Sequence, residues 1–190
     1  EDYAMADILT GGRIIFGVGR GYQSREVETL GSPVIDNDAN KDLFEEQMEI
    51  IFKAFSLDSF SHEGKHYTIP ARVPFRGYDL KEITLVPRPV NQPVEIWQPI
   101  ASGRTLEYIA SKGIKGMVTL TGEKLVDSMF HSYRDLSAKY GRDLQLGEDL
   151  ALGIGFYLAG SQQAAMERVR SSHDERYKWF APFGFVRYTD

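Results

Sequence analysis

The chain contains no cysteine among its 190 residues, so disulfide bonds and thiolate chemistry play no part in its function. It also lacks any block of lysine and arginine, and its net charge at pH 7 is −5. Both features argue against nucleic acids and anionic membrane surfaces as partners. No apolar run approaches the roughly 20 residues that a transmembrane helix needs.

A secretory signal is also missing, because the opening residues Glu1 to Met5 carry neither a basic region nor an apolar core. We therefore expect a cytoplasmic protein. With 42% hydrophobic residues, the chain can bury a core, and we expect a single domain over residues 1–190. The chain begins without methionine, and helical spacing starts at Tyr3, so we expect a fragment that begins inside a helix.

The stretch from Leu9 to Tyr22 organises the rest of the chain. Paired glycines at 11–12 predict the end of a helix. The apolar run 14–18 is rich in β-branched residues and predicts a strand buried on both faces, as in a parallel sheet. That strand leads to Arg20, flanked by glycines, at the carboxyl end of the strand, where sites are built in α/β proteins.

A polar loop over 23–38 precedes a helix with an apolar stripe at i, i+4, i+7, i+8 and i+11. The stripe consists of Phe44, Met48, Ile51, Phe52 and Phe55. We interpret this stripe as core packing rather than as a cofactor site. Residues 60–92 then interrupt the pattern with a predicted β-hairpin over 60–69, a proline-rich loop and a short strand over 83–86. Long insertions of this kind are usually functional.

Three further strand–helix units follow. Strands are predicted over 94–100, 114–120 and 150–159, each followed by a helix, the last beginning at Ser161. Alternating strands and helices predict a parallel sheet with right-handed crossovers. A complete (β/α)8 barrel needs about 250 residues. The predicted fold is therefore α/β, a partial TIM-type barrel of about four βα units with a β-hairpin insertion at about 60–92.

Two familiar motifs occur in the sequence without the neighbouring residues and helix that their chemistry needs. The glycines of residues 17–21 suggest a dinucleotide fingerprint, but Tyr22 stands where a third glycine is needed and no helix opens there. The sequence His62-Glu63-Gly64-Lys65-His66 matches the H-E-x-x-H zinc signature. That chemistry needs both histidines on one face of a helix, whereas Gly64 and the following residues predict a hairpin.

A phosphate site divided between two strand ends is better supported. Arg20 ends one strand, and Ser102, Gly103, Arg104 and Thr105 follow the next and open a helix. Helix-terminal N–H groups, hydroxyls and an arginine fork suit phosphate oxygens. The alternative is that the hydroxyls only cap the helix and that Arg20 forms a structural salt bridge.

These segments resemble the bacterial luciferase-like flavin monooxygenase family. The resemblance rests on the Leu-Thr-Gly-Gly-Arg and Gly-Val-Gly-Arg-Gly-Tyr segments of residues 9–22, with Glu26 and Gly31 beyond them. It extends through the hairpin at 63–67, the segment 85–89 and the strand and loop at 94–106, so that it covers about 1–159. The family's early barrel strands, which carry an active-site histidine, have no counterpart here, and the closing strand is missing.

The resemblance implies an enzyme that uses reduced FMN and O2 to oxygenate a small organic substrate, with the reduced flavin coming from a flavin reductase. It implies that Arg20, Ser102 and Thr105 contact the flavin phosphate, with Gly103 and Arg104 as loop neighbours. We expect no metal site, because the context of the H-E-x-x-H segment does not suit zinc. No catalytic residue is assigned, because the four histidines (His62, His66, His131 and His173) lie on the insertion or on helices.

Several alternatives stay open. An F420-dependent oxidoreductase of the same family would use the same phosphate contacts. A non-catalytic barrel that binds a phosphorylated ligand, or a zinc peptidase based on His62, Glu63 and His66, would belong to other classes. The oligomeric state is open, a homo-oligomer included. With apolar, uncharged strands at both sheet edges, we expect the chain alone to be inactive and to associate through those edges.

Overall fold

The computed structural model describes residues 1–21, 27–31, 37–72, 74–119 and 122–180. The chain forms two compact units, residues 1–152 and 153–190. Most of the predicted loop over 23–38 lies outside the described residues, as do Tyr22, Glu26 and Leu120.

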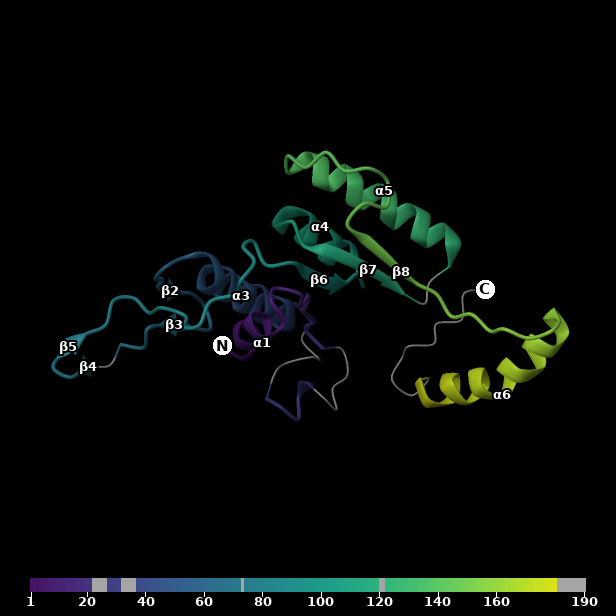
Figure 1. The fold of residues 1–190 in the computed structure, drawn as a ribbon, viewed down its shortest axis with the longest axis horizontal. Helices are drawn as coiled ribbons and strands as arrows, with labels where there is room; N and C mark the ends of the chain where they lie inside the picture. Colours follow the sequence, from purple (N-terminus) through teal and green to yellow (C-terminus); the bar gives the residue numbers. More distant parts are fainter. Residues whose placement is uncertain (22–26, 32–36, 73, 120–121, 181–190) are drawn as a thin grey trace. The chain divides into compact units, whose positions relative to one another are not determined.

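A four-stranded sheet in the order β1-β6-β7-β8 lies at the centre of the first unit (Figure 1). The strands are β1 (Phe16–Gly17), β6 (Ile96–Pro99), β7 (Lys115–Thr119) and β8 (Leu150–Gly153). β1 pairs with β6 and β6 with β7 in parallel, with Phe16 opposite Ile96 and Trp97 opposite Lys115. The predicted α/β class with a parallel sheet is confirmed, and the described strands form part of a barrel rather than a closed one.

The strands are shorter than the apolar runs that predict them. β1 occupies two residues of the run 14–18, and β8 ends at Gly153 rather than at 159. The prediction that the first run is buried on both faces is wrong, because Ile15 is 55% exposed. β1 is an edge strand of this sheet, and an apolar run without a neighbour on one side has neither the hydrogen bonds nor the cover that would extend it.

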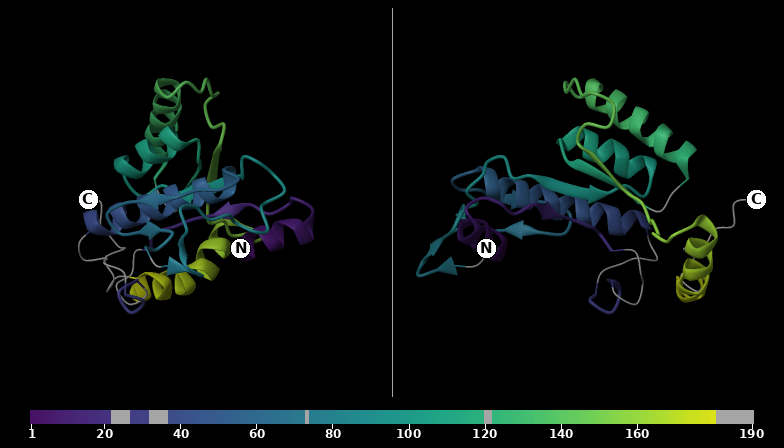
Figure 2. Two further views of the ribbon diagram at one scale, coloured as in Figure 1. Left: turned by 90° about the vertical axis from the view of Figure 1, so that its left-hand side faces the viewer. Right: turned by 45° about the vertical axis from the view of Figure 1, so that its right-hand side comes forward.

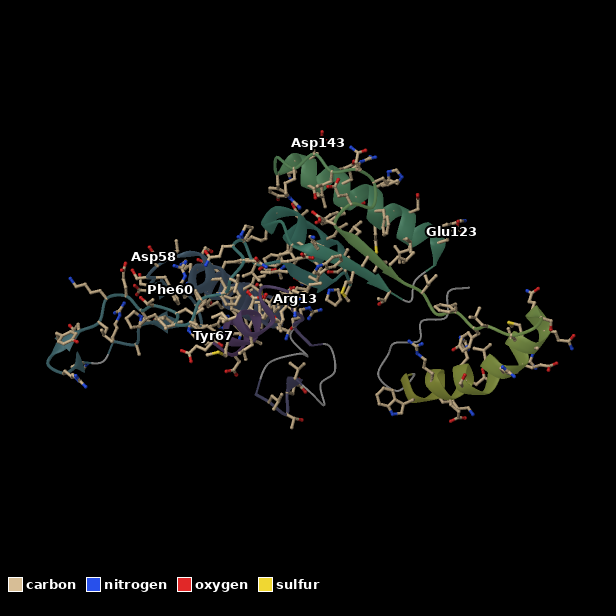
Figure 3. The ribbon with its side chains drawn as sticks, in the orientation of Figure 1. Arg13, Asp58, Phe60, Tyr67, Glu123 and Asp143 are labelled. Atoms are coloured by element: carbon tan, nitrogen blue, oxygen red, sulfur yellow. The ribbon has the colours of Figure 1, made fainter. Side chains whose placement is uncertain are left out.

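The helices of the first unit follow their local signals. They are α1 (Asp2–Thr10), α3 (Asn37–Ser56), α4 (Gly103–Lys112) and α5 (Glu123–Lys139). Gly11 ends α1 in the left-handed conformation with φ 68°, and Gly113 does the same for α4. Figure 2 shows α4 and α5 covering the same face of the sheet, and Figure 3 marks Glu123 and Asp143 near the two ends of α5.

The core lies between this face of the sheet and the helices. It is made of Phe44, Met48, Ile96, Ile100, Leu106, Ile109, Ala110, Ile114, Val118 and Tyr133. The predicted stripe of α3 is confirmed: Phe44 and Met48 are buried in this cluster, with Ile51 and Phe52 packed against it. The stripe's last ring, Phe55, packs against Tyr3 and Phe16 instead, with centroids 5.4 and 5.6 Å apart.

The segment between α3 and β6 carries two short antiparallel pairs. β2 (His62–Glu63) pairs with β3 (Thr68–Ile69), and β4 (Pro74–Phe75) pairs with β5 (Tyr78–Asp79). The predicted hairpin over 60–69 is therefore confirmed. The strand expected over 83–86 is wrong, since that stretch forms a single antiparallel bridge from Ile83 to Phe60. Figure 3 labels Phe60 at the base of this segment and Tyr67 on its first hairpin.

The second unit contains α6 (Gln162–Phe180). The Oγ of Ser161 accepts a hydrogen bond from the backbone N–H of Ala164 at 3.2 Å, so the predicted N-cap is confirmed. Among the described residues, no helix combines the length and the apolar character needed to cross a membrane.

Candidate phosphate-binding site

The parallel pairing of β1 and β6 places the two predicted phosphate elements together. Arg20 follows β1, and the loop that opens α4 follows β6. Arg20, Arg104 and Thr105 line one small cavity of about 10 Å³. Neighbouring parallel strands bring their carboxyl ends to the same edge of a sheet. Arg20 and Thr105 therefore lie close together in the fold although they are far apart in the sequence.

Ser102 caps α4. Its Oγ accepts a hydrogen bond from the backbone N–H of Thr105 at 3.2 Å and lies 3.0 Å from the Thr105 Oγ1. The capping alternative is therefore realised. It leaves room for a ligand as well, because a Cβ added at Gly103 would meet nothing within 4 Å. The amides of Gly103 and Arg104 belong to the first turn of α4, which has no intrahelical acceptor for them.

Arg20 is held by Asn40 of α3 at both ends. Its Nη1 donates to the Asn40 Oδ1 at 2.5 Å, and the Asn40 Nδ2 donates to the backbone oxygen of Arg20 at 3.4 Å. Asn40 is only 3% exposed. Sequence reasoning missed this residue, yet a signal existed: Asn40 precedes Phe44 by one helical turn and therefore lies on the apolar stripe of α3.

Arg104 faces carboxylates instead. Its Nε donates to the Glu45 Oε1 at 3.0 Å and its Nη2 to the Asp42 Oδ1 at 3.0 Å, with Asp38 3.6 Å from Nη1. The hydrogen bonds that Arg104 donates to Glu45 and Asp42 raise the pKa of Arg104 above its usual value. Hydrogen bonds from Arg104 and then Lys65 lower the pKa of Asp42. In this structure Arg104 fastens the first turn of α4 to α3.

Two buried polar atoms of residues that line the small cavity have no hydrogen-bond partner among the described residues. Gln98 is 5% exposed, and its Oε1 has no hydrogen-bond partner among the described residues. The same holds for the Tyr108 hydroxyl, whose pKa is raised by burial and then by the charges of Glu45 and Glu49. Gln98 was also missed from sequence, although it is a polar residue between two buried isoleucines, Ile96 and Ile100.

A second cavity, of about 290 Å³, opens on another side of Arg20. Its lining includes Gly19 and Gly21 beside the arginine, the buried Asn40, and apolar side chains such as Leu43 and Phe44. Arg20 therefore borders both cavities, and it is the one predicted site residue that the structure places in each.

The H-E-x-x-H residues lie in the hairpin rather than on a helix, as predicted. His62 is buried, with its Nε2 3.1 Å from the Glu46 Oε1 and its Nδ1 3.3 Å from the Lys53 Nζ. Glu46 also accepts hydrogen bonds from the backbone N–H groups of His66 and Tyr67, at 2.9 Å each. These contacts fasten the hairpin to α3. The described part of the chain contains no cluster of three or more potential metal ligands.

The model of the luciferase-like monooxygenase family matches residues 1–188, so the chain belongs to this family, and the predicted resemblance is confirmed. Among curated proteins, it is 26% identical over 119 residues to the uncharacterised protein y4vJ of Sinorhizobium fredii, which covers 62% of this chain and 30% of the relative.

Solved structures show the same fold at low identity. The oxygenating constituent of 3,6-diketocamphane monooxygenase from Pseudomonas putida, a type II Baeyer–Villiger monooxygenase in complex with FMN, matches with a TM-score of 0.70 and 17% identity, over 94% of this chain and 51% of its own. DmoA from Hyphomicrobium sulfonivorans matches with a TM-score of 0.60 and 18% identity, over 89% and 39%. Riboflavin lyase RcaE, with modified FMN and riboflavin, matches with 0.60 and 17%, over 90% and 40%. The chain thus spans about half or less of the length of these proteins.

Proposed function

We propose that this chain provides the flavin-phosphate site of a flavin-dependent monooxygenase, which uses reduced FMN and O2 to oxygenate a small organic substrate. The observation that carries the proposal is the meeting of Arg20 and Thr105 in one cavity at the carboxyl ends of adjacent parallel strands. Membership in the luciferase-like family supports it, as does the FMN named in two of the similar structures.

The residues present fit a phosphate group. Arg20 offers a guanidinium fork, and the first turn of α4 offers backbone N–H groups, the positive end of a helix dipole and an open approach over Gly103. The nearby carboxylates of Asp42 and Glu45 are paired with Arg104, which lessens their repulsion of an anion. Tyr108, which lines the same cavity, adds a buried hydroxyl that can donate a hydrogen bond and has no partner among the described residues.

When bound, the flavin supplies the redox and oxygen chemistry. The residues of this chain bind and orient it. Arg20 holds the phosphate by charge and geometry, while the ion pairs of Arg104 keep the first turn of α4 fixed against α3. We propose a separate flavin reductase as the source of reduced FMN.

The test compares FMN with riboflavin, which lacks the phosphate, by fluorescence titration of the 190-residue chain. The Arg20→Ala variant should weaken FMN binding by about 1.5–3 kcal/mol, the range for hydrogen bonds to charged groups, and leave riboflavin binding unchanged. Arg20→Lys should recover only part of the loss, because a point charge does not reproduce the fork.

The matched control is Arg13→Ala, an exposed arginine that precedes β1 at the opposite end of the strand (Figure 3). It should leave both affinities unchanged. Unaltered FMN affinity in Arg20→Ala would reject the site. Because F420 also carries a phosphate, a parallel titration with F420 decides between the two cofactors.

A further inference from the structure

Helix α3 provides different kinds of hydrogen-bond partner for the two arginines of the site, Arg20 and Arg104. It offers Arg20 a neutral carboxamide, that of the buried Asn40. It offers Arg104 the carboxylates of Asp42 and Glu45, each at 3.0 Å. The two kinds of partner come from different faces of one helix, because Asp42 and Glu45 are three residues apart and Asn40 lies on the apolar stripe.

The difference matters for an anionic ligand. A carboxamide oxygen orients a guanidinium by a hydrogen bond and leaves its full charge available. A carboxylate in the same place would orient it equally well but would cancel the charge and repel a phosphate. Among the described residues, no acidic side chain is paired with Arg20.

The contact between Asn40 and Arg20 also fixes the orientation of the arginine side chain. Asn40 binds the guanidinium with its oxygen and the Arg20 backbone oxygen with its nitrogen, so one side chain fixes both ends of the arginine. At 3% exposure, Asn40 has little freedom to move away. Fixing an arginine before the ligand arrives reduces the ordering cost of binding.

We propose that Asn40 is a positioning residue that aims Arg20 at a phosphate-bearing ligand while preserving its charge, and that Arg104 only supports the helix. This inference rests on the proposed function, since it assumes that Arg20 contacts a phosphate. It adds a requirement that the phosphate site alone does not impose: the partner of Arg20 must be neutral.

The deciding variant is Asn40→Asp, which keeps the shape of the side chain and adds one negative charge. FMN and riboflavin dissociation constants are measured by fluorescence titration of the full chain, with thermal unfolding followed by circular dichroism. We expect Asn40→Asp to weaken FMN by about tenfold or more, because a carboxylate within a few ångströms opposes the phosphate. Riboflavin affinity should stay within about twofold of the original, since the added charge faces no phosphate.

A second variant separates positioning from packing. Asn40→Ala removes the orientation without adding charge, so it should weaken FMN less than Asn40→Asp does. A merely structural role gives the reverse order, because Asp would form an ion pair with Arg20 while Ala would leave a gap. The matched control, Asp42→Asn, should change the ratio of riboflavin to FMN dissociation constants by less than about twofold.

The outcomes distinguish the two proposals. If the unmodified chain binds FMN and riboflavin equally, the phosphate site itself is wrong, and this inference fails with it. If the unmodified chain prefers FMN and Asn40→Asp keeps that preference, only the role of Asn40 is overturned. Should Asn40→Asp fail to fold, Asn40→Ala decides: a reduced preference for FMN supports the role, and an unchanged preference overturns it.

Discussion

Helices α4 and α6 begin in the same way and end up in different surroundings. In each, a serine Oγ accepts a hydrogen bond from a backbone N–H at 3.2 Å: Ser102 accepts from Thr105, and Ser161 accepts from Ala164. The apolar face of α4 is buried, with Ile109 at 0% exposure, whereas Met166 of α6 is 54% exposed.

The comparison separates helix initiation from helix burial, which look alike in a sequence pattern. A capping serine starts a helix through local hydrogen bonds, and it does so in both places. Burial requires a partner, and α4 has the sheet and α5. Most helical stability in proteins comes from packing of an apolar face. The two equivalent caps should therefore contribute different amounts to the global stability of the protein.

The largest difference is expected from apolar truncation. Ile109→Ala leaves a cavity in the core and should lower the free energy of unfolding by about 2–5 kcal/mol. Met166→Ala in α6 should change it by less than about 0.5 kcal/mol, as for other exposed side chains. Urea unfolding followed by circular dichroism measures both, and equal losses would show that α6 is packed as firmly as α4.

Added volume should give the next largest effect. A Cβ at Gly116 would lie 2.7 Å from Cδ atoms of Ile100 and of Leu150, so Gly116→Ala should cost about 1–3 kcal/mol by overpacking. At Gly155 in the second unit, a Cβ would meet nothing within 4 Å. Gly155→Ala should therefore be neutral or slightly stabilising in the same urea experiment. A neutral Gly116→Ala would mean that the side chains of Ile100 and Leu150 can move away from β7 at little cost.

The caps themselves test the comparison most directly. Ser102→Ala should lower global stability by about 0.5–2 kcal/mol, because α4 unfolds together with the core. Ser161→Ala should increase amide hydrogen exchange within α6 and leave the global transition in place. If both variants shift the global transition equally, the two helices belong to one cooperative unit.

The smallest effect is expected from surface ion pairs. Arg104 joins α4 to α3, whereas Lys178 of α6 pairs with Glu175 in its own helix, at 2.7 Å. Arg104→Ala should cost a few tenths of a kcal/mol, less at high salt, and Lys178→Ala should leave the global transition unchanged. Since Arg104 lowers the pKa of Asp42, this contribution is present above the ordinary carboxyl pKa and is lost as pH falls through the lowered value. Urea unfolding at two salt concentrations and two pH values tests it.

The helices, their ends and the first hairpin could be predicted because their signals are local: apolar periodicity, a capping serine, and glycines such as Gly11 and Gly113. Strand lengths could not, since the run 14–18 shows apolar character but not whether a neighbour lies on each side. The placement of Arg20 and Thr105 in the lining of one cavity followed from the rule for parallel strand ends. Asn40 and Gln98 were missed because the sequence does not show which residues lie beside a polar side chain on a buried face. That becomes known only from the fold.

The antiparallel bridge at the base of the long segment after α3 has a consequence for chain length. Phe60 and Ile83 exchange two backbone hydrogen bonds, at 2.9 and 3.0 Å, and Phe60 is 5% exposed, so the base is fixed within the first unit. The bridge between Phe60 and Ile83 closes the intervening chain into a loop. Doubling the length of such a loop costs only about 0.6 kcal/mol in closure entropy. The turn at Arg76 and Gly77, exposed and with positive φ at both residues, is therefore the place where residues or a reporter peptide can be inserted at least cost to the core.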